Sequence, residues 1–373
     1  MKLKIGLTFL AGFLACAALL VLTAATQSPT KAIPASELDV YYPGTEDLEP
    51  DEMRVVALGT GMPSARPKQA SACWLVELGN GDKFLFDIGS GCHARIAAQK
   101  IPYDYLNKVF VGHLHVDHIG DLPTFWLGGI VMNRLVPIRI WGPSGGTPEY
   151  GTKHALRMMQ KTYVWDIGTR SGVNDMRGGV LEVNEFPFDG VNQVIYEENG
   201  VVVRSIPAVH GLDGAVSFIL TWNGLKFVYG SDTVPNKWYV GHAKGADVAI
   251  HESFLPPALL IAKQGYAPKE ALMVGTQGHT SPEQFGKVMS LVKPRHAVGY
   301  HFYNDFDTEP VVRERIRRTY DGPLDLATDY MVWNVTKDKS QVRMSAIDDA
   351  DWHLPSHQKT NVPETTQARW HQE

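Results

Sequence analysis

The chain has 373 residues, of which 44% are hydrophobic, and this suits one large α/β domain or two small ones with a substantial core. Its 35 lysines and arginines against 40 aspartates and glutamates give a formal charge of −5 at pH 7, and we find no long basic run. The composition therefore argues against a dedicated nucleic-acid-binding protein.

The N-terminal segment has the layout of a secretory signal, because two lysines precede an apolar run over residues 5–25 that ends in small side chains. The run approaches the length of a membrane span, so an uncleaved anchor is the alternative. A lipoprotein site at Cys16 is weaker, since the run continues past it. We predict a signal peptide or membrane anchor over 1–26 and a linker rich in Pro, Ser, Thr and acids over 27–53, with the domain exported to the periplasm or held outside the cytoplasm.

The first part of the domain reads as strands followed by a short helix. Residues 54–58 are β-prone, and 73–78 and 83–88 flank Gly79-Asn80-Gly81-Asp82, which is a hairpin signal. A short helix is expected over 93–99. Cys73 and Cys92 lie in this region, and an exported pair could form a disulfide, although Cys92 could equally pack as a small apolar residue.

The most informative stretch follows the strand over 108–111, which Gly112 ends. His113, His115, Asp117 and His118 then form the pattern H-x-H-x-D-H. Imidazole nitrogen and carboxylate oxygen are ligands that Zn²⁺ prefers when no thiolate is present. Four donors within six residues are too dense for one metal sphere but well spaced for two neighbouring ones. The alternative, a histidine-rich surface turn, requires this spacing to arise by chance.

The rest of the chain alternates helices with short strands. The expected elements are helices over 122–132 and 150–163, a strand over 136–141, a polar glycine-rich loop over 166–179, and hairpins over 194–206 and 217–229. Repeated hairpins followed by single helices suit two β-sheets with helices on their outer sides. We place the domain at 54–337 and expect a polar, poorly ordered tail over 338–373.

With its H-x-H-x-D-H loop the sequence resembles the metallo-β-lactamase superfamily. Further stretches resemble the ribonuclease Z-like branch of that superfamily, namely 57–63 (ALGTGMP), 85–91 (LFDIGSG), 230–233 (GSDT), 251–254 (HESF) and 278–284 (GHTSPEQ). The resemblance covers about Val55 to Val335, and it extends to a metallo-hydrolase group named for guanitoxin biosynthesis. It implies an α/β fold of four layers, an αββα sandwich. Dimers are frequent in the superfamily, so a homodimer is an open expectation.

The resemblance also implies a ligand set for two divalent metal ions, with Zn²⁺ expected ahead of Mn²⁺ or Fe²⁺. One ion would be held by His113, His115 and His210. The other would be held by Asp117, His118 and His301, with Asp232 bridging the two. The local contexts of His210, Asp232 and His301 agree with this, because each follows an apolar run at the point where a strand gives way to a loop.

A second group of residues is assigned by the same resemblance. Asp117, Glu252 and His279 are the candidate catalytic residues, with His279 contacting the phosphoryl oxygen and protonating the leaving group while Glu252 orients its ring. The alternative role for His279 is to cap the helix beginning near Ser281. Asp87 is a candidate for holding a ligand histidine in its tautomer.

The remaining histidines and the aromatic residues near the loops are less informative. Four histidines match no ligand of the family and are interpreted as ordinary: His93, His154, His242 and His296. Three aromatic residues beside the ligand-bearing loops could line an apolar pocket or belong to the core: Trp126, Phe302 and Tyr303.

The function expected from this pattern is hydrolysis, since two adjacent ions can activate a bridging water to hydroxide and stabilise charge on the attacked oxygen. We expect a small phosphodiester or related ester as substrate. The acidic balance, the export signal and the lack of a basic cluster over 142–199 make tRNA processing of the ribonuclease Z type a second choice rather than the first. An arylsulfatase, a lactonase or a non-catalytic metal-binding protein of the same fold would also be consistent with the pattern. Membrane contact is expected through the N-terminal segment alone.

Overall fold

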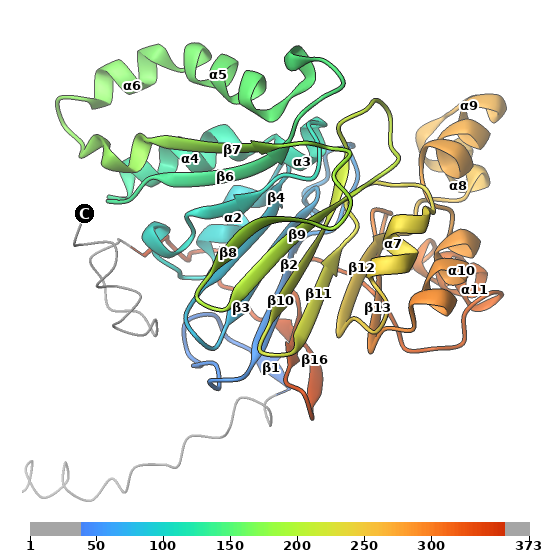
Figure 1. Ribbon diagram of the computed structural model, residues 1–373. Helices are drawn as coiled ribbons and strands as arrows, with labels where there is room; N and C mark the ends of the chain where they lie inside the picture. Colours follow the sequence, from blue (N-terminus) through green and yellow to red (C-terminus); the bar gives the residue numbers. More distant parts are fainter. Residues whose placement is uncertain (1–38, 355–373) are drawn as a thin grey trace, which may run out of the picture. The chain divides into compact units, whose positions relative to one another are not determined.

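The computed structural model describes residues 39–354. The expected leader, the start of the linker and the end of the tail lie outside these residues. Within the described range two β-sheets pack face to face, and helices cover the outer face of each sheet (Figure 1). This is the four-layer αββα sandwich expected from the sequence.

The larger sheet has nine strands and the smaller has seven. In spatial order the larger sheet contains β1 (Val40–Tyr41), β16 (Ser340–Ser345), β15 (Met331–Val335), β2 (Met53–Gly59), β3 (Cys73–Leu78), β4 (Lys83–Ile88), β5 (Lys108–Phe110), β6 (Ile138–Pro143) and β7 (Leu181–Phe186). The smaller sheet contains β14 (Leu324–Leu326), β13 (His296–Tyr300), β12 (Val248–Glu252), β11 (Leu225–Tyr229), β10 (Val216–Trp222), β9 (Val201–Pro207) and β8 (Gln193–Glu198).

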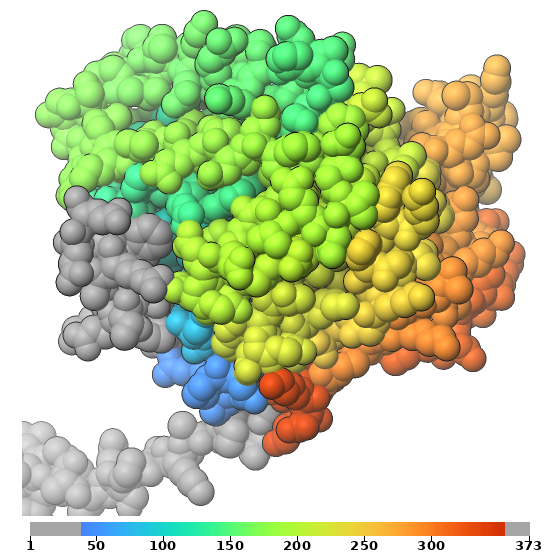
Figure 2. Space-filling model, in the orientation of Figure 1, coloured from blue at the N-terminus to red at the C-terminus, as the bar shows by residue number. Residues whose placement is uncertain are grey.

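The helices fall into two groups, one in each half of the chain. Those of the first half are α2 (Cys92–Ala97), α3 (Val116–Ile119), α4 (Leu122–Val131), α5 (Thr152–Thr162) and α6 (Val164–Arg170). Those of the second half are α7 (Lys237–His242), α8 (Pro257–Gln264), α9 (Pro268–Met273), the π-helical turn η5 (Val274–Gly278), α10 (Pro282–Val292) and α11 (Glu309–Arg317). In Figure 2 the green surface of α5 and α6 and the orange surface of α8 and α9 lie on opposite sides of the face in view.

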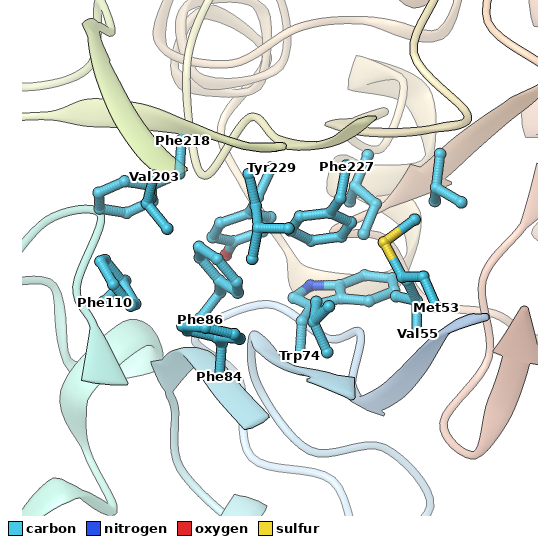
Figure 3. Packing of buried hydrophobic residues seen from close by; sticks show 14 of the residues in the cluster. Met53, Val55, Trp74, Phe84, Phe86, Phe110, Val203, Phe218, Phe227 and Tyr229 are labelled. Atoms are coloured by element: carbon cyan, nitrogen blue, oxygen red, sulfur yellow. The ribbon is translucent and has the colours of Figure 1, made fainter. Parts of the chain in front are cut away.

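The main core lies between the two sheets and is rich in aromatic rings (Figure 3). Phe86 of the larger sheet lies 5.7 Å from Phe218 and 5.1 Å from Phe227 of the smaller sheet, measured between ring centroids. Each buried aromatic ring removes a large apolar area from water and adds a preferred tilted contact. Two further apolar clusters join α2 and α4 to the larger sheet and α7, α10 and α11 to the smaller one.

Turn chemistry explains the hairpins that the sequence predicted. Asn199 and Gly200 have φ values of 52° and 75°, and Asn223 and Gly224 have 49° and 80°. Two consecutive left-handed residues make the type I′ turn that matches strand twist, and asparagine and glycine are the residues that adopt it most readily. The predicted hairpins β8–β9 and β10–β11 are therefore confirmed.

Three sequence expectations about the chain's organisation need correction. The expected linker contributes β1 and the expected tail contributes β16, and these two strands pair at the edge of the larger sheet. A buried Arg343 in β16, held by Glu46 at 2.9 Å and Asn334 at 2.8 Å, explains why this polar segment is ordered. The expected loop over 166–179 contains most of α6, whose Asp166 and Arg170 form an i,i+4 ion pair at 2.5 Å.

Cys73 and Cys92 form a disulfide bond, which settles the two possibilities left open by the sequence. Both residues are fully buried, one at the start of β3 and the other at the start of α2. The bond closes the segment that carries β3, β4 and the turn 89–91. It therefore fixes the end of β4 beside the helix that follows it.

None of the helices within residues 39–354 combines the length and hydropathy needed to cross a membrane. What positions the functional residues is strand direction. β4 and β5 run parallel in the larger sheet, and β11, β12 and β13 run parallel in the smaller one. Their carboxyl-terminal ends meet along one edge of the sandwich, where loops from both sheets can converge.

Candidate metal centre and active site

All seven predicted metal ligands come together at this edge. The donor atoms form two groups, and within each group all atoms lie within 4.8 Å of one another. The outer position consists of His113, His115 and His210, and the inner position consists of Asp117, His118 and His301. Asp232 belongs to both groups.

In the outer position three imidazole nitrogens point at one another. His115 Nδ1 lies 3.0 Å from His113 Nε2 and 3.1 Å from His210 Nε2. His113 and His115 flank one residue of the loop after β5, whereas His210 comes from the loop after β9. Three ring nitrogens converging on one point suit a shared cation better than hydrogen bonds, because a neutral imidazole has one N–H and one acceptor.

The inner position is buried, and its ligands face one another as closely. His301 Nε2 lies 3.1 Å from Asp117 Oδ2, and His118 Nε2 lies 3.6 Å from the same oxygen. Asp117 and His118 lie on the short helix α3, and His301 follows β13. One helical turn thus places two ligands on the inner side of the loop that also provides the outer pair.

Asp232 lies between the two positions. Its Oδ1 is 3.4 Å from His118 Nε2, while its Oδ2 is 3.7 Å from His210 Nε2 and 3.4 Å from His301 Nε2. Both oxygens thus face the inner group, and Oδ2 also faces the outer group, so this one carboxylate could contact an ion in either position. The residue follows β11 directly, in the predicted Gly-Ser-Asp-Thr turn.

Unpartnered buried atoms test whether these residues fit a metal ion. His118 Nε2 and Asp117 Oδ1 are buried and have no hydrogen-bond partner within residues 39–354. Buried polar atoms are normally paired, and a cation held between these ligands would give both atoms a partner. The donor set of imidazoles and carboxylates is the one that Zn²⁺ and similar ions prefer. The residues therefore fit two divalent ions.

The charges around the site point the same way. Burial opposes protonation of His118, yet the carboxylates of Asp232, Asp87 and Asp117 raise its pKa well above the ordinary value. Burial would raise the pKa of Asp232, but the imidazoles of His301 and His118 hold it well below the usual range. An environment that favours positive charge this strongly also favours a divalent cation.

Asp87 orients the inner histidine, as the sequence suggested. His118 Nδ1 lies 2.6 Å from Asp87 Oδ2, which leaves Nε2 as the nitrogen that faces the centre. Asp87 also accepts a hydrogen bond of 2.7 Å from the Gly112 N–H and one of 2.6 Å from the Tyr229 hydroxyl. A carboxylate that fixes the ligand's tautomer and rotation is a common support for metal-bound histidine.

Unusual backbone conformations recur at this edge. Asp87, Ser231 and His301 have φ values of 58°, 51° and 67°, the left-handed region that non-glycine residues rarely adopt. Such conformations persist where surrounding contacts fix them, and they cluster at functional sites. A side chain at Gly112 would place its Cβ 2.3 Å from Ser231 Oγ, so only glycine allows the two loops to approach this closely.

Buried Glu252 and partly buried His279 form a pair beside the centre. His279 Nδ1 lies 2.6 Å from Glu252 Oε2 and 3.9 Å from Asp232 Oδ2. Glu252 Oε1 accepts a hydrogen bond from the Thr233 N–H at 2.8 Å, and Phe254 stacks on the His279 ring at 4.0 Å between centroids. These contacts fix the ring and leave its Nε2 free to meet a substrate.

Burial and the charge of Asp232 raise the pKa of Glu252 well above its ordinary value, whereas burial lowers the pKa of His279. The alternative role for His279 is excluded, because Ser281 caps α10. Its hydroxyl accepts from the Gln284 N–H, and the Gln284 side chain reaches back to the Ser281 N–H.

The three aromatic residues singled out in the sequence are buried, and two of the four ordinary histidines have partners outside the metal-donor groups. Trp126 and Phe302 are each 1% exposed within the outer apolar clusters, and Tyr303 is 8% exposed, so these rings belong to the core rather than to an open pocket. His93 contacts the Tyr103 hydroxyl and His296 contacts Asp325, which agrees with their interpretation as ordinary residues.

Sequence reasoning missed two buried tyrosines that serve the centre. The Tyr229 hydroxyl donates to Asp87, and Tyr300, which lies 3.2 Å from Tyr229, donates to Asp232 Oδ1 at 3.4 Å. Each tyrosine ends a strand that leads to a ligand. Nothing in the sequence indicated that their hydroxyls reach carboxylates.

Comparison with known proteins agrees with this geometry. Ribonuclease Z of Mycobacterium marinum is 31% identical over 205 residues, which cover 53% of this chain and 70% of that protein. The chain belongs to the ribonuclease Z-like branch of the metallo-β-lactamase superfamily. It is thus a metal-dependent hydrolase of ester bonds. A family model described as anti-Pycsar protein Apyc1 also matches residues 53–141.

Solved structures share the fold of this hydrolase. Human tRNase Z, short form, is 19% identical to this chain. The match covers 75% of this chain and 98% of the tRNase Z, with a TM-score of 0.54. Zn²⁺-bound PqqB from Methylobacterium extorquens is 14% identical, covers 75% of this chain and 99% of its own length, and has the same TM-score of 0.54. The closer resemblance to the group named for guanitoxin biosynthesis stays a prediction.

Proposed function

We propose that this hydrolase cleaves a small phosphodiester outside the cytoplasm, using two Zn²⁺ ions bridged by Asp232. The observation that carries the proposal is the pair of buried Glu252 and partly buried His279, which lies beside two groups of metal donors that share one carboxylate. Two ions held there would lower the pKa of a shared water toward 7 and neutralise charge on the attacked phosphoryl oxygen.

The chain's own residues supply the rest of the chemistry. Asp232 joins the inner and outer donor groups at a fixed separation, so the reacting groups are positioned before substrate arrives. His279 presents Nε2 toward the substrate and provides a proton for the leaving oxygen, while Glu252 keeps its ring oriented through Nδ1. Phe254 covers one face of His279 and excludes water from it.

Several features favour a small ester over precursor tRNA. The chain is acidic overall, and helices α5 and α6 occupy the region between β6 and β7. Two arginines in this region are already paired with aspartates, Arg170 with Asp166 and Arg177 with Asp175. These arginines are therefore less available to contact phosphates of a nucleic acid. The similarity to ribonuclease Z of Mycobacterium marinum nevertheless makes tRNA processing the second candidate.

Export is part of the proposal because of the N-terminal apolar run in the sequence, and the disulfide supports it, since such bonds persist in oxidising compartments. A direct check is to fuse a reporter phosphatase that is active only after export behind residue 53. Activity of the fusion in intact cells is expected. A fusion that stays inactive although it is made would overturn export.

The reaction is tested with the full chain, loaded with zinc and quantified for metal. It should be assayed against an aryl phosphodiester, an aryl sulfate, a lactone and a precursor tRNA at matched concentrations. We expect hydrolysis of the phosphodiester at a rate well above that of the others. Preferred cleavage of the tRNA would support the second candidate, and two bound ions without turnover of any substrate would support a non-catalytic role.

A further inference from the structure

A small cavity adjoins the outer metal position. It has a volume of about 230 Å³. Its walls come from three separate segments: the loop over 207–214, Phe188 with Asp189 after β7, and Trp238 of α7. His210 lies both in this wall and in the outer metal position. A substrate held at the metals can therefore reach the cavity past His210.

The cavity combines aromatic walls with unneutralised negative charge. Phe188 and Trp238 are partly buried, and Leu212 is 71% exposed beside them. Asp189 and Asp213 line the same cavity, and neither carboxylate has a hydrogen bond or ion pair with another residue of the described chain. The lining residues include no lysine or arginine.

The charge of this lining disfavours the phosphate group of a phosphodiester and favours a positively charged ester group. A phosphate group would face two carboxylates and no cation, so the cavity does not fit the reacting phosphate. An ammonium group would be attracted by both carboxylates and by the faces of the aromatic rings.

Size limits the group further. Pockets for drug-sized ligands usually measure about 300–1,000 Å³, so a cavity of about 230 Å³ suits one compact group rather than a nucleotide chain. A quaternary or primary ammonium on a short linker meets both requirements of charge and size.

We propose that this cavity is a specificity subsite for the ammonium group of the substrate, so that the preferred phosphodiester carries a choline-like or amine-bearing ester group. The proposal rests on the proposed phosphodiesterase function. In it, the metals hold the phosphate, His210 separates the two parts of the site, and Asp189, Asp213 and Trp238 hold the cation. Water cleaves one of the two ester bonds. The ammonium-bearing group is then released as the free alcohol, or it stays esterified in the phosphomonoester product.

The test compares two glycerophosphodiesters, of which one carries an ammonium group and the other does not. The zinc-loaded full chain is assayed with glycerophosphocholine and with glycerophosphoglycerol, and bis(p-nitrophenyl) phosphate reports the basal reaction. We expect kcat/KM for glycerophosphocholine to exceed that for glycerophosphoglycerol, whose second alcohol group carries no charge, by about tenfold or more. The double variant Asp189→Asn with Asp213→Asn should remove this preference and leave the aryl ester unchanged.

Two further variants make the result specific. Trp238→Leu should weaken the choline ester alone, and Glu197→Gln, which removes an exposed carboxylate outside the cavity, should change neither ester. Calorimetric titration with tetramethylammonium supplies a readout that needs no turnover. Binding to the parent protein that is lost in the double aspartate variant is the expected result.

The two proposals fail in different ways. If the aryl ester is not hydrolysed while tetramethylammonium binds through Asp189 and Asp213, the phosphodiesterase function is wrong and the ammonium site stands. If the aryl ester is hydrolysed but the choline ester has no advantage and tetramethylammonium does not bind, the subsite is overturned. An advantage that survives in the double aspartate variant also overturns it.

Discussion

The inner and outer metal positions differ in how completely the fold fixes their ligands. In the inner position Asp117, His118 and His301 are at most 1% exposed, and Asp87 holds His118 at 2.6 Å. In the outer position His115 is exposed, and His113 has a longer contact of 3.3 Å to Ser231 Oγ. His210 is held by the Gly278 carbonyl at 3.0 Å.

This difference indicates a division of roles. Buried, oriented ligands cost less to organise when a cation binds, so the inner position should bind its ion more tightly and exchange it more slowly. The outer position borders solvent at His115 and the cavity at His210. The inner site thus resembles a structural site in its rigidity, whereas the outer site has the access that catalysis requires.

Removal of the shared carboxylate should break both positions and have the largest effect. For Asp232→Ala we expect metal content to fall from two ions to one or none and hydrolysis to drop by about 10³-fold. Metal analysis of the loaded protein and steady-state assays measure this. The matched control is Asp321→Asn, an exposed carboxylate far along the chain, which should keep both ions. A variant that retains two ions would show that Asp232 is no bridge.

Loss of His279 should reduce turnover without touching either position. His279→Gln removes the proton donor, and we expect kcat to fall by about 10²–10⁴-fold with two ions still bound. Phe254→Leu, which removes only the ring stacked on His279, should have a much smaller effect. Unchanged kcat in His279→Gln would refute its catalytic role, and a lost ion would instead assign it to the centre as a ligand.

Asp87→Asn should separate the two positions most sharply. The change removes the charge that orients His118, so the inner ion should bind about 10–100-fold more weakly while the outer ion changes little. Titration with a competing chelator resolves the two affinities. Tyr229→Phe removes one donor to Asp87 and should produce a smaller shift of the same sign. Equal weakening of both ions would contradict the proposed asymmetry.

The smallest effect on the centre is expected from the disulfide. Replacing Cys73 and Cys92 by alanine opens the loop behind Asp87, and should lower the free energy of unfolding by about 3 kcal/mol. Urea unfolding of the metal-free proteins measures the change. The inner ion should weaken slightly, because the end of β4 becomes less fixed. A double variant as stable as its parent would show that packing alone holds this turn.

Local chemistry explains why much of the fold could be predicted. Asn199-Gly200 and Asn223-Gly224 specify turns by themselves, and alternating apolar residues specify the strands on either side. The β16 strand could not be predicted, because its order depends on a buried arginine whose partners, Glu46 and Asn334, lie far away in the chain or in another strand. Helix α6 was missed for a different, local reason, since its glycine and polar residues have weak helical preference.

By itself the sequence indicated the candidate metal ligands, because the H-x-H-x-D-H pattern lies within one loop and His210, Asp232 and His301 each follow an apolar run. Only the tertiary structure decided how these residues differ in burial, which hydroxyls support them, and that Asp189, Asp213 and Trp238 share a cavity with His210. These are contacts between segments that are distant in the chain. Their energies depend on distance and on exclusion of water, and neither quantity exists until the two sheets have packed.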